Sequence, residues 1–389
     1  MTGLEFFENV PVMPHAGIQA HVPQGGPIWP DFEAQHGARF CFRGRPVDLA
    51  PKWHKPERRF RRPAVWGGYL SHEFGHLVAE HLTRVLPASL ARPDDLFAFT
   101  LPQGQSPETL PDYLWQIFDW LAVPRASVRF VLRPSLAPEL RVAPQGEMLG
   151  NLPPDPAYLD ALDTLPERHG LALGHRVPLF YVTRAGWAAK GRGAHLGETY
   201  LVKLLRQLGV PVIDPATLSI RAQMQAYAQA EVLVFAEGSA LHGRQLLGRI
   251  DQEIHVLNRR PGGELAQKPL AARCRRLVHH DVTAELLTVS GRVKTRVPKP
   301  RDMRHLAASF YDLDALFATF AGLGVNLARV WNMAAYRDAA LSDALNWVLA
   351  QEAGAEQTLP NLIRIIEQTS SLDDLPPTPV LPAARQALH

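Results

Sequence analysis

The sequence predicts an α/β protein, and the signal is strongest in the second half of the chain. From about residue 176, short apolar runs alternate with segments of helical periodicity, and the connections between them are short. This alternation favours a parallel, doubly wound sheet, because a parallel strand is joined to the next through a crossover helix. The apolar runs occupy residues 177–182, 210–213, 232–236 and 253–258.

Helices are expected between these strands. The first covers residues 195–207 and stops at Gly209, since glycine readily adopts the left-handed conformation of a helix end. Ser219 is a suitable N-cap for the second helix, which ends near Ala230. The turn at residues 237–242 leads into a third helix.

The N-terminal half contains one clear helical signal. Ser71 is a suitable N-cap, and apolar residues recur at helical spacing from Phe74 to Val85, ahead of Pro87. We therefore expect a helix that begins at Ser71. Residues 1–66 are rich in proline, glycine and aromatic side chains and predict irregular strands and loops.

Three parts are expected along the chain. A helix over residues 114–121 and a strand over residues 127–132 complete the N-terminal half, and the Pro-rich stretch 151–156 leads towards a boundary. The C-terminal part is mostly helical in pattern, with an apolar stripe for core packing, and ends in a Pro-rich tail from Pro376. The predicted parts are residues 1–170, 171–302 and 303–389.

Composition excludes several classes of protein. With 389 residues, 46% of them hydrophobic, the chain is long enough for two domains with separate cores. The first residues lack a signal-peptide pattern and no stretch approaches 18 apolar residues, so a cytoplasmic location is expected. The net charge of +3 is too small to indicate nucleic-acid binding. Cys41 and Cys274 are too few, and too far apart in sequence, for a disulfide framework or a metal cluster.

Basic residues are concentrated in two runs. The first covers residues 55–62, and the second covers residues 292–296 with Lys299, Arg301 and Arg304. Both runs fit solvated loops beside prolines. They also fit attraction to anionic lipid headgroups or to a lipid-diphosphate acceptor, which would place the protein peripherally at the inner face of a membrane.

The residues His72, Glu73 and His76 have the spacing of a zinc-hydrolase motif. Two histidines one helical turn apart can hold zinc while the intervening glutamate activates a water molecule. On the predicted helix, these three residues and Glu80 fall within about one quarter-turn, which favours a helix facing a polar cleft.

The zinc interpretation lacks a third ligand. A metzincin would carry glycine and histidine where this chain has Ala79 and Leu82, and His81 stands one residue short of the required position. A zinc-dependent hydrolase therefore remains an alternative, and no metal ligand is predicted.

Ligands of parallel sheets bind at the carboxyl ends of the strands. The turn at Gly238 and Ser239 opens a predicted helix there, and backbone N–H groups at a helix start can bind a diphosphate. Lys190 and Arg192 can add charge-assisted hydrogen bonds. The same rule also selects Arg184, Glu237 and His242. No glycine-rich dinucleotide fingerprint or P-loop is present, which disfavours a dehydrogenase or an NTPase.

The order of these motifs resembles family 61 glycosyltransferases. Gly75, His76 and Glu80 match the upstream G-H-x-x-x-E signature of the family, and the similarity covers roughly residues 65–250. The downstream matches are residues 181–184, a basic residue with 197–198, 208–209 with 212–215, 219–223, Ala230 and 237–241. The chain departs from the family pattern at Gly197, where many members have asparagine, and at Glu237, where many have histidine.

The resemblance implies a GT-B architecture, in which two Rossmann-like domains face each other across a cleft. It implies an inverting transfer from a nucleotide-sugar donor, held by the C-terminal domain, to a glycan or lipid-linked glycan acceptor, as in bacterial capsular or cell-surface polysaccharide synthesis. No cofactor and no essential metal are implied. The candidate base is His76, oriented by Glu80 or Glu73, and His72 is the second candidate.

The same resemblance implies a donor site on the second half of the chain. The diphosphate would meet the start of the helix at 238–242 together with Arg184, Lys190 and Arg192, while Glu198 and Glu237 would bind ribose or sugar hydroxyls. The predicted donor-binding residues of the turn are Glu237, Gly238, Ser239, Ala240, Leu241 and His242. A non-catalytic carbohydrate- or partner-binding protein derived from this fold is a further alternative.

Overall fold

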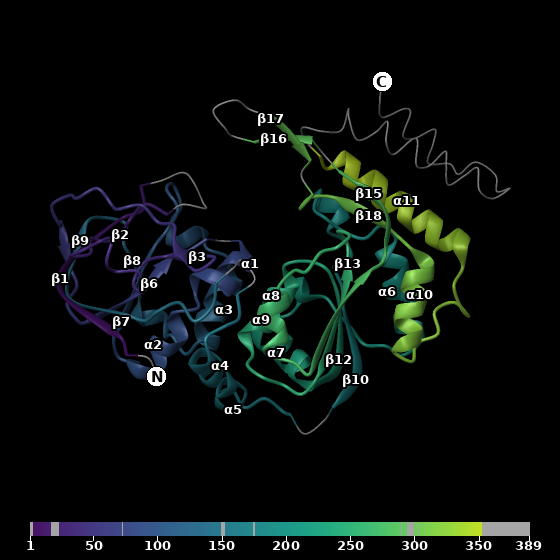
Figure 1. Cartoon of the computed structure of the whole chain (residues 1–389), viewed down its shortest axis with the longest axis horizontal. Coiled ribbons are helices and arrows are strands. Elements are labelled where there is room, and N and C mark those ends of the chain that lie inside the picture. Colours follow the sequence, from purple (N-terminus) through teal and green to yellow (C-terminus); the bar gives the residue numbers. More distant parts are fainter. Residues whose placement is uncertain are drawn as a thin grey trace.

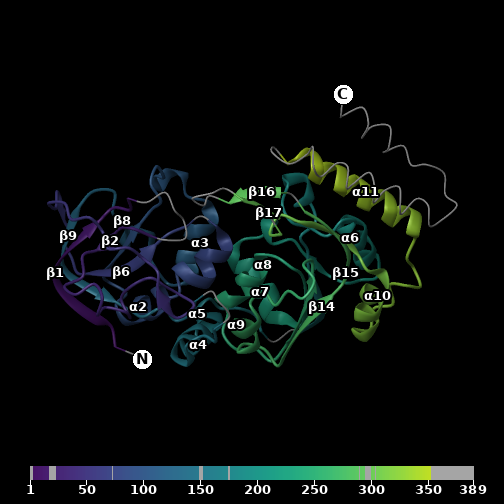
Figure 2. The same cartoon turned by 45° about the horizontal axis from the view of Figure 1, so that its top comes forward.

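The computed structural model describes residues 3–16, 23–71, 73–148, 152–173, 176–288, 290–293, 299–302 and 304–351. Two α/β halves lie side by side along the longest axis of the molecule, each built on its own sheet (Figure 1). Helix α3 of the first half faces the second half (Figure 2), where it contacts α7, and α1 contacts α8. The Pro-rich tail predicted from Pro376 lies outside the described residues.

The N-terminal half contains a mixed sheet with strand order β2-β1-β9-β6-β7-β8, and β5 pairs with β9. Strands β6, β7 and β8 are parallel, whereas β1 and β9 form an antiparallel pair. The strands are β1 (Glu5–Met13), β2 (Gly26–Pro27), β5 (Arg58–Arg59), β6 (Ala64–Tyr69), β7 (Leu96–Thr100), β8 (Val128–Phe130) and β9 (Ser135–Val142), beside a separate hairpin of β3 (Cys41–Phe42) and β4 (Arg45–Pro46). The first 66 residues are therefore more ordered than the sequence predicts, because β1 is stabilised by pairing with a strand more than 120 residues away.

The predicted helix at Ser71 is wrong in its start and in its continuity. Ser71 Oγ accepts a hydrogen bond from the Glu73 backbone N–H at 3.1 Å, and the helix α1 (Phe74–His76) begins three residues later. One π-helical turn, η1 (Leu77–His81), follows and is closed by the Leu82 N–H on the Leu77 carbonyl at 3.0 Å. A turn at residues 82–84 then interrupts the helix before α2 (Val85–Ala91) begins. The other helices of this half are η2 (Pro107–Thr109), α3 (Asp112–Trp120), η3 (Arg125–Ser127), α4 (Pro156–Asp163) and α5 (Leu165–Arg168).

The second half confirms the predicted parallel sheet. Its strand order is β11-β10-β12-β13-β14, and every neighbouring pair is parallel. The strands are β10 (Val177–Val182), β11 (Val212–Ile213), β12 (Ala230–Ala236), β13 (Glu253–Asn258) and β14 (Arg276–Asp281). The last of these was not predicted, because it is a half-exposed strand without an apolar run.

Helices join these strands as predicted, with one shifted start. The connecting helices are η4 (Ala188–Lys190), α6 (Glu198–Gln207), η5 (Pro215–Thr217), α7 (Ile220–Gln229), α8 (Ala240–Gly243), η6 (Arg244–Leu246) and α9 (Gln267–Ala271). Helix α6 begins at Glu198 and not at His195, because Gly197 before it adopts a left-handed φ of 81°. Ser219 caps α7 as predicted, since its Oγ accepts from the Ala222 N–H at 3.2 Å.

One hydrophobic core runs between the two sheets. It includes Phe97 and Phe118 from the first half and Tyr227 and Phe235 from the second, all fully buried. Trp120 at the end of α3 donates its indole N–H to the Leu246 carbonyl at 2.8 Å. The halves therefore share buried apolar surface, and their relative position is fixed by side-chain packing.

The C-terminal part packs against the outer side of the second sheet (Figure 1). The described residues from 283 onward form two antiparallel strand pairs, which were not predicted and mostly precede residue 303. Two helices follow, in agreement with the mostly helical pattern expected from residue 303. The elements are β15 (Thr283–Leu287) with β18 (Ala308–Tyr311), β16 (Ser290–Val293) with β17 (Lys299–Asp302), α10 (Leu313–Gly322) and α11 (Met333–Leu349). Asp343 of α11 accepts from the Gly197 N–H at 2.9 Å, so this helix supports the start of α6. Within the described residues, no helix has both the length and the apolar character needed to cross a membrane.

Candidate active site

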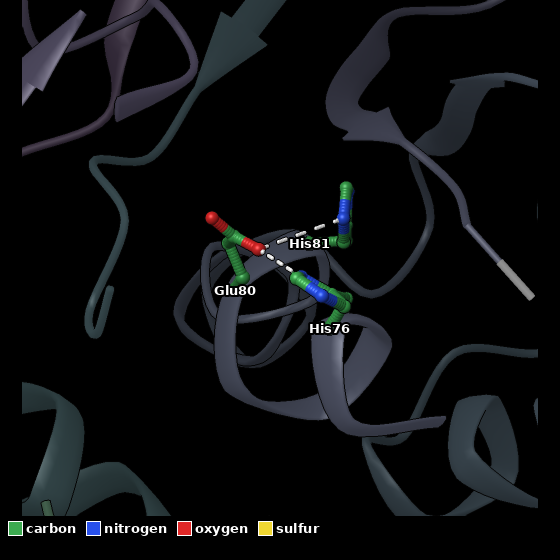
Figure 3. A group of neighbouring side chains, drawn as sticks. All are labelled: His76, Glu80 and His81. Atoms are coloured by element: carbon green, nitrogen blue, oxygen red, sulfur yellow. Dashed lines mark hydrogen bonds and ion pairs between the residues drawn. The ribbon is translucent and has the colours of Figure 1, made fainter. Parts of the chain in front are cut away.

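The candidate catalytic pair is His76 and Glu80, which lie just beyond the carboxyl end of β6. His76 Nδ1 and Glu80 Oε2 are 2.8 Å apart, and the Glu80 side chain is 4% exposed against 34% for His76 (Figure 3). The Glu80 backbone is held in place because its carbonyl accepts from Gln145 Nε2 and Thr83 Oγ1. A buried carboxylate thus faces one nitrogen of a partly exposed imidazole.

The contact with Glu80 determines which nitrogen of the His76 ring carries the proton, and it also affects the pKa of the ring. Because the Glu80 carboxylate is an acceptor, Nδ1–H of His76 donates to it and Nε2 is left as the basic nitrogen. The hydrogen bond to Glu80 raises the pKa of His76, and this effect exceeds the lowering by burial. Glu73 Oε2 lies 3.6 Å from Nε2 on a side chain that is 64% exposed. The arrangement suits a general base that becomes charged during the reaction.

The pH dependence of activity should report this pair. Activity is expected to fall as pH decreases through the raised pKa of His76, because the protonated ring cannot accept a proton. Glu80→Gln removes the group that raises this pKa, so the acid limb of the profile should move to lower pH while the maximal rate decreases. A kcat profile measured for both proteins checks this, with Glu139→Gln, a change at an exposed carboxylate of β9, as the control. An unshifted acid limb in Glu80→Gln would remove Glu80 from this role.

His81 is a third member of this cluster, which the sequence analysis did not select. Its Nδ1 donates to the Tyr69 carbonyl at 2.8 Å, its ring stacks on Phe40, and burial lowers its pKa to about 3. Its Nε2 therefore carries a lone pair, and this atom lies 3.8 Å from Glu80 Oε2 (Figure 3). The sequence analysis set His81 aside because it stands one residue short of the third-ligand position of the metzincin motif. In the structure it closes the π turn, and its ring lies close to the carboxylate that His76 also contacts.

Metal ligation would use a different set of residues from the one in the sequence motif. One candidate ligand atom each from His76, Glu80 and His81 lies within 4.8 Å of the others. His72, the first histidine of the motif and the second candidate base, lies outside the described residues. The described part of the chain thus places two histidines and a carboxylate within reach of one ion.

The segment that carries His76 directly contacts the second half of the chain at Gly75. A Cβ atom at this position would lie 2.9 Å from His242 Cδ2 and 3.6 Å from Ser239 Cβ, so only glycine fits without displacing the facing turn. His242 is buried, and this burial lowers its pKa to about 4. Its Nδ1 bonds to Gln245 Oε1. Two motifs that are about 160 residues apart in sequence therefore form one site.

A cavity of about 420 Å³ opens between the halves, at the carboxyl ends of β10 and β12. The second half contributes Thr183, Arg184, Trp187, Pro215, Ala216, Leu218, Ile220, Gln223, Ala236, Ser239 and Ala240, and the first half contributes Phe74, Asp112, Tyr113 and Gln116. The residues from α3 and Trp187 were missed by the sequence analysis. Among these missed residues, only Trp187 could have been selected from the sequence, because it stands in the predicted loop after the first parallel strand, where ligands of such sheets bind.

Arg184 lies over the turn that the sequence analysis selected. Its guanidinium occupies the space that a side chain at position 238 would need, so Gly238 permits this contact. Arg184 Nε donates to the Gly193 carbonyl at 2.5 Å, and its Cζ is 4.8 Å from the Trp187 ring centre. Lys190 Nζ lies 4.9 Å from the same ring, and both Lys190 and Arg192 are exposed. Arg184 thus provides a positive charge in the cavity wall.

The two predicted glutamates do not face the cavity. Both are completely buried, and neither lines it. Glu237 accepts from the backbone N–H groups of Arg259 and Arg260 and forms an ion pair with Arg260. Glu198 accepts through one oxygen from Tyr181, Thr183 and the Arg184 N–H. In this geometry the carboxylates hold the loops that carry Arg184 and Arg260, which corrects the expectation that they bind sugar hydroxyls directly.

The helix after the turn is short. Helix α8 has four residues, and the N–H groups of Leu241 and His242 are used by the carbonyls of Gly238 and Ser239. Leu241 is fully buried in the core, whereas Ala240 lines the cavity. A helix dipole therefore contributes little here, and the positive charge comes from side chains.

A family model matches the part of the chain that contains this candidate site. No curated protein matches the chain. Residues 74–244 match the family model described as Glycosyltransferase 61, a segment that begins at α1 and ends just after α8. It contains His76 and Glu80 as well as Arg184 and the turn at Gly238. The match supports the glycosyltransferase 61 family for this chain, and with it a transferase that binds a donor and an acceptor.

Proposed function

We propose that the protein transfers a sugar from a nucleotide-sugar donor to a hydroxyl group of a glycan or glycolipid, with inversion and without an essential metal. The observation that carries this proposal is the contact between the His76 motif and the turn at Ser239 and His242, beside a cavity at the strand ends. We further propose a GT-B arrangement and a role in cell-surface polysaccharide synthesis on the cytoplasmic side of the membrane.

The donor is proposed to occupy the 420 Å³ cavity. Its diphosphate lies near the Arg184 guanidinium, with Lys190 and Arg192 adding positive charge from the exposed loop. The Trp187 ring in the cavity wall offers a flat apolar surface for a base or ribose. The sugar then points towards His76, because Ser239 packs beside Gly75.

The chemistry follows from this placement. His76 Nε2 takes the proton of the acceptor hydroxyl while the acceptor oxygen attacks the anomeric carbon. The bond between that carbon and the diphosphate oxygen breaks, and the nucleoside diphosphate leaves with the electron pair. Glu80 stabilises the imidazolium that forms, and Arg184 stabilises the negative charge that develops on the leaving group.

Replacing Arg184 should test the donor position. Arg184→Ala is expected to weaken binding of the cognate nucleotide by about 1.5–3 kcal/mol, because a charged hydrogen-bonding partner is lost. The cognate donor is first identified by thermal stabilisation with a panel of nucleotide sugars, and the affinity is then measured by calorimetry. Lys203→Ala removes an exposed charge of α6 and serves as the control. Equal affinities for wild type and Arg184→Ala would contradict this placement.

The grouping of His76, Glu80 and His81 favours one second candidate, a metal-dependent hydrolase. Tightly bound stoichiometric zinc in the purified protein, lost in His81→Ala, would support that function over the transferase. A protein that binds a nucleotide sugar without turning it over would instead be a binding protein derived from the same fold.

A further inference from the structure

A second cavity lies on the N-terminal half, between β5, the end of β8 and the start of β9. It measures about 780 Å³, and no residue of the described chain lines both this cavity and the donor cavity. We call it the arginine cavity, because six arginines line it: Arg58, Arg59, Arg61, Arg62, Arg129 and Arg133.

Three of these six arginines have no partner among the described residues. Within the described part of the chain, the guanidinium groups of Arg58, Arg59 and Arg61 make no hydrogen bond or ion pair. Arg133 makes one exposed ion pair, with Glu57 at 3.6 Å. Arg62 and Arg129 donate to backbone carbonyls.

The charge in this cavity is not balanced locally. None of the described residues that line it is acidic, although the whole chain carries 41 basic and 38 acidic residues. Like charges held together in this way repel one another, and an anion that enters the cavity removes the repulsion. The planar guanidinium matches the oxygens of a phosphate group through paired hydrogen bonds. The cavity is therefore suited to phosphate-bearing ligands.

An exposed apolar residue beside the arginines favours lipid headgroups as the source of the phosphate. Leu132 lines the cavity and is 52% exposed. In the sequence shortly before Arg58, Trp53 is 61% exposed and follows the exposed Lys52. Basic side chains combined with exposed tryptophan and leucine are typical of a surface that enters the headgroup region of a bilayer. A site for a soluble anion has no need of these apolar groups.

We infer that this face of the protein docks on an anionic membrane surface. Lipid phosphate groups enter the arginine cavity, and the exposed Leu132 in its wall inserts at the level of the headgroups. The inference is independent of the transferase reaction, because docking needs neither donor nor acceptor.

Vesicle binding by the full chain tests this inference. Sedimentation with phosphatidylcholine vesicles containing phosphatidylglycerol is compared with sedimentation with pure phosphatidylcholine vesicles at physiological salt. The test variant combines Arg58→Ser, Arg59→Ser and Arg61→Ser, which removes three unpartnered charges. Its partition onto anionic vesicles should fall on the order of 10²-fold, since each basic residue near such a surface contributes about fivefold.

A matched control removes the same charge from elsewhere. Lys203→Ser, Arg206→Ser and Arg329→Ser lie on exposed positions of the second half and the C-terminal part, and this variant should bind like the wild type. Equal thermal melting of all three proteins shows that folding is preserved. Equal binding to both kinds of vesicle, or equal losses in the two triple variants, would overturn the inference. So would binding of soluble inorganic polyphosphate by a protein that does not bind the vesicles.

Discussion

His76→Ala is expected to slow glycosyl transfer by roughly 10²–10⁴-fold, because the group that accepts the proton in the transition state is lost. Donor binding should remain within about twofold of wild type, since the proposed donor cavity is not lined by His76. The two quantities are measured separately, by a transfer assay at saturating donor and by calorimetry with the nucleotide. His36→Ala changes a histidine for which no role is proposed and serves as the control.

A nearly normal transfer rate in His76→Ala would move the base to another residue. Glu73 is then the next described candidate, because its carboxylate is exposed 3.6 Å from the same ring. If His76→Ala lowers both the donor affinity and the transfer rate, the substitution has instead disturbed the contact between Gly75 and His242.

Glu147→Ala should reduce the free energy of unfolding by about 3–5 kcal/mol, because it leaves a buried arginine without its counterion. Glu147 belongs to the N-terminal half and forms an ion pair with Arg273 of the second half, and both side chains are at most 1% exposed. Glu147 also accepts from Gln245, the residue that bonds to His242. Urea denaturation of wild type and variant measures the change.

An exposed ion pair between the same halves provides the control for this prediction. Asp160 of α4 pairs with Arg249 at 2.9 Å, and its side chain is 69% exposed. Asp160→Ala should cost no more than about 1 kcal/mol, because solvent screens the pair. If the two variants lose similar amounts of unfolding free energy, burial is not the reason why Glu147 stabilises the protein.

The parallel sheet could be predicted from the sequence because its signals are local. Strand β12 is an apolar run, and α7 before it carries its own serine cap. The antiparallel pairing of β1 with β9 could not be predicted in this way. Its paired residues, such as Glu5 and Val142, lie far apart in the sequence, and neither strand contains a local pattern that identifies its partner. Strand β14 was missed because partly exposed strands contain polar residues.

The candidate residues that the sequence could select are likewise those with a local signal. His76 and Glu80 were selected by their spacing and Arg184 by its position after a strand, and the structure places these residues around one contact between the halves. His81 was set aside because it stands one residue short of the third-ligand position of the metzincin motif, whereas the chain forms a π turn there and the His81 ring lies close to Glu80. Asp112 and Gln116 line the cavity only because α3 packs against the second half, and tertiary packing of this kind leaves no local pattern.

The most direct test of the proposed function is the release of nucleoside diphosphate from a panel of nucleotide sugars, with EDTA-treated protein and glycan or water as acceptor. We expect one class of donor to be turned over at a rate that EDTA does not change and that His76→Ala reduces by at least about 10²-fold. No turnover of any nucleotide sugar, together with a hydrolytic activity that EDTA removes and zinc restores, would contradict the proposal.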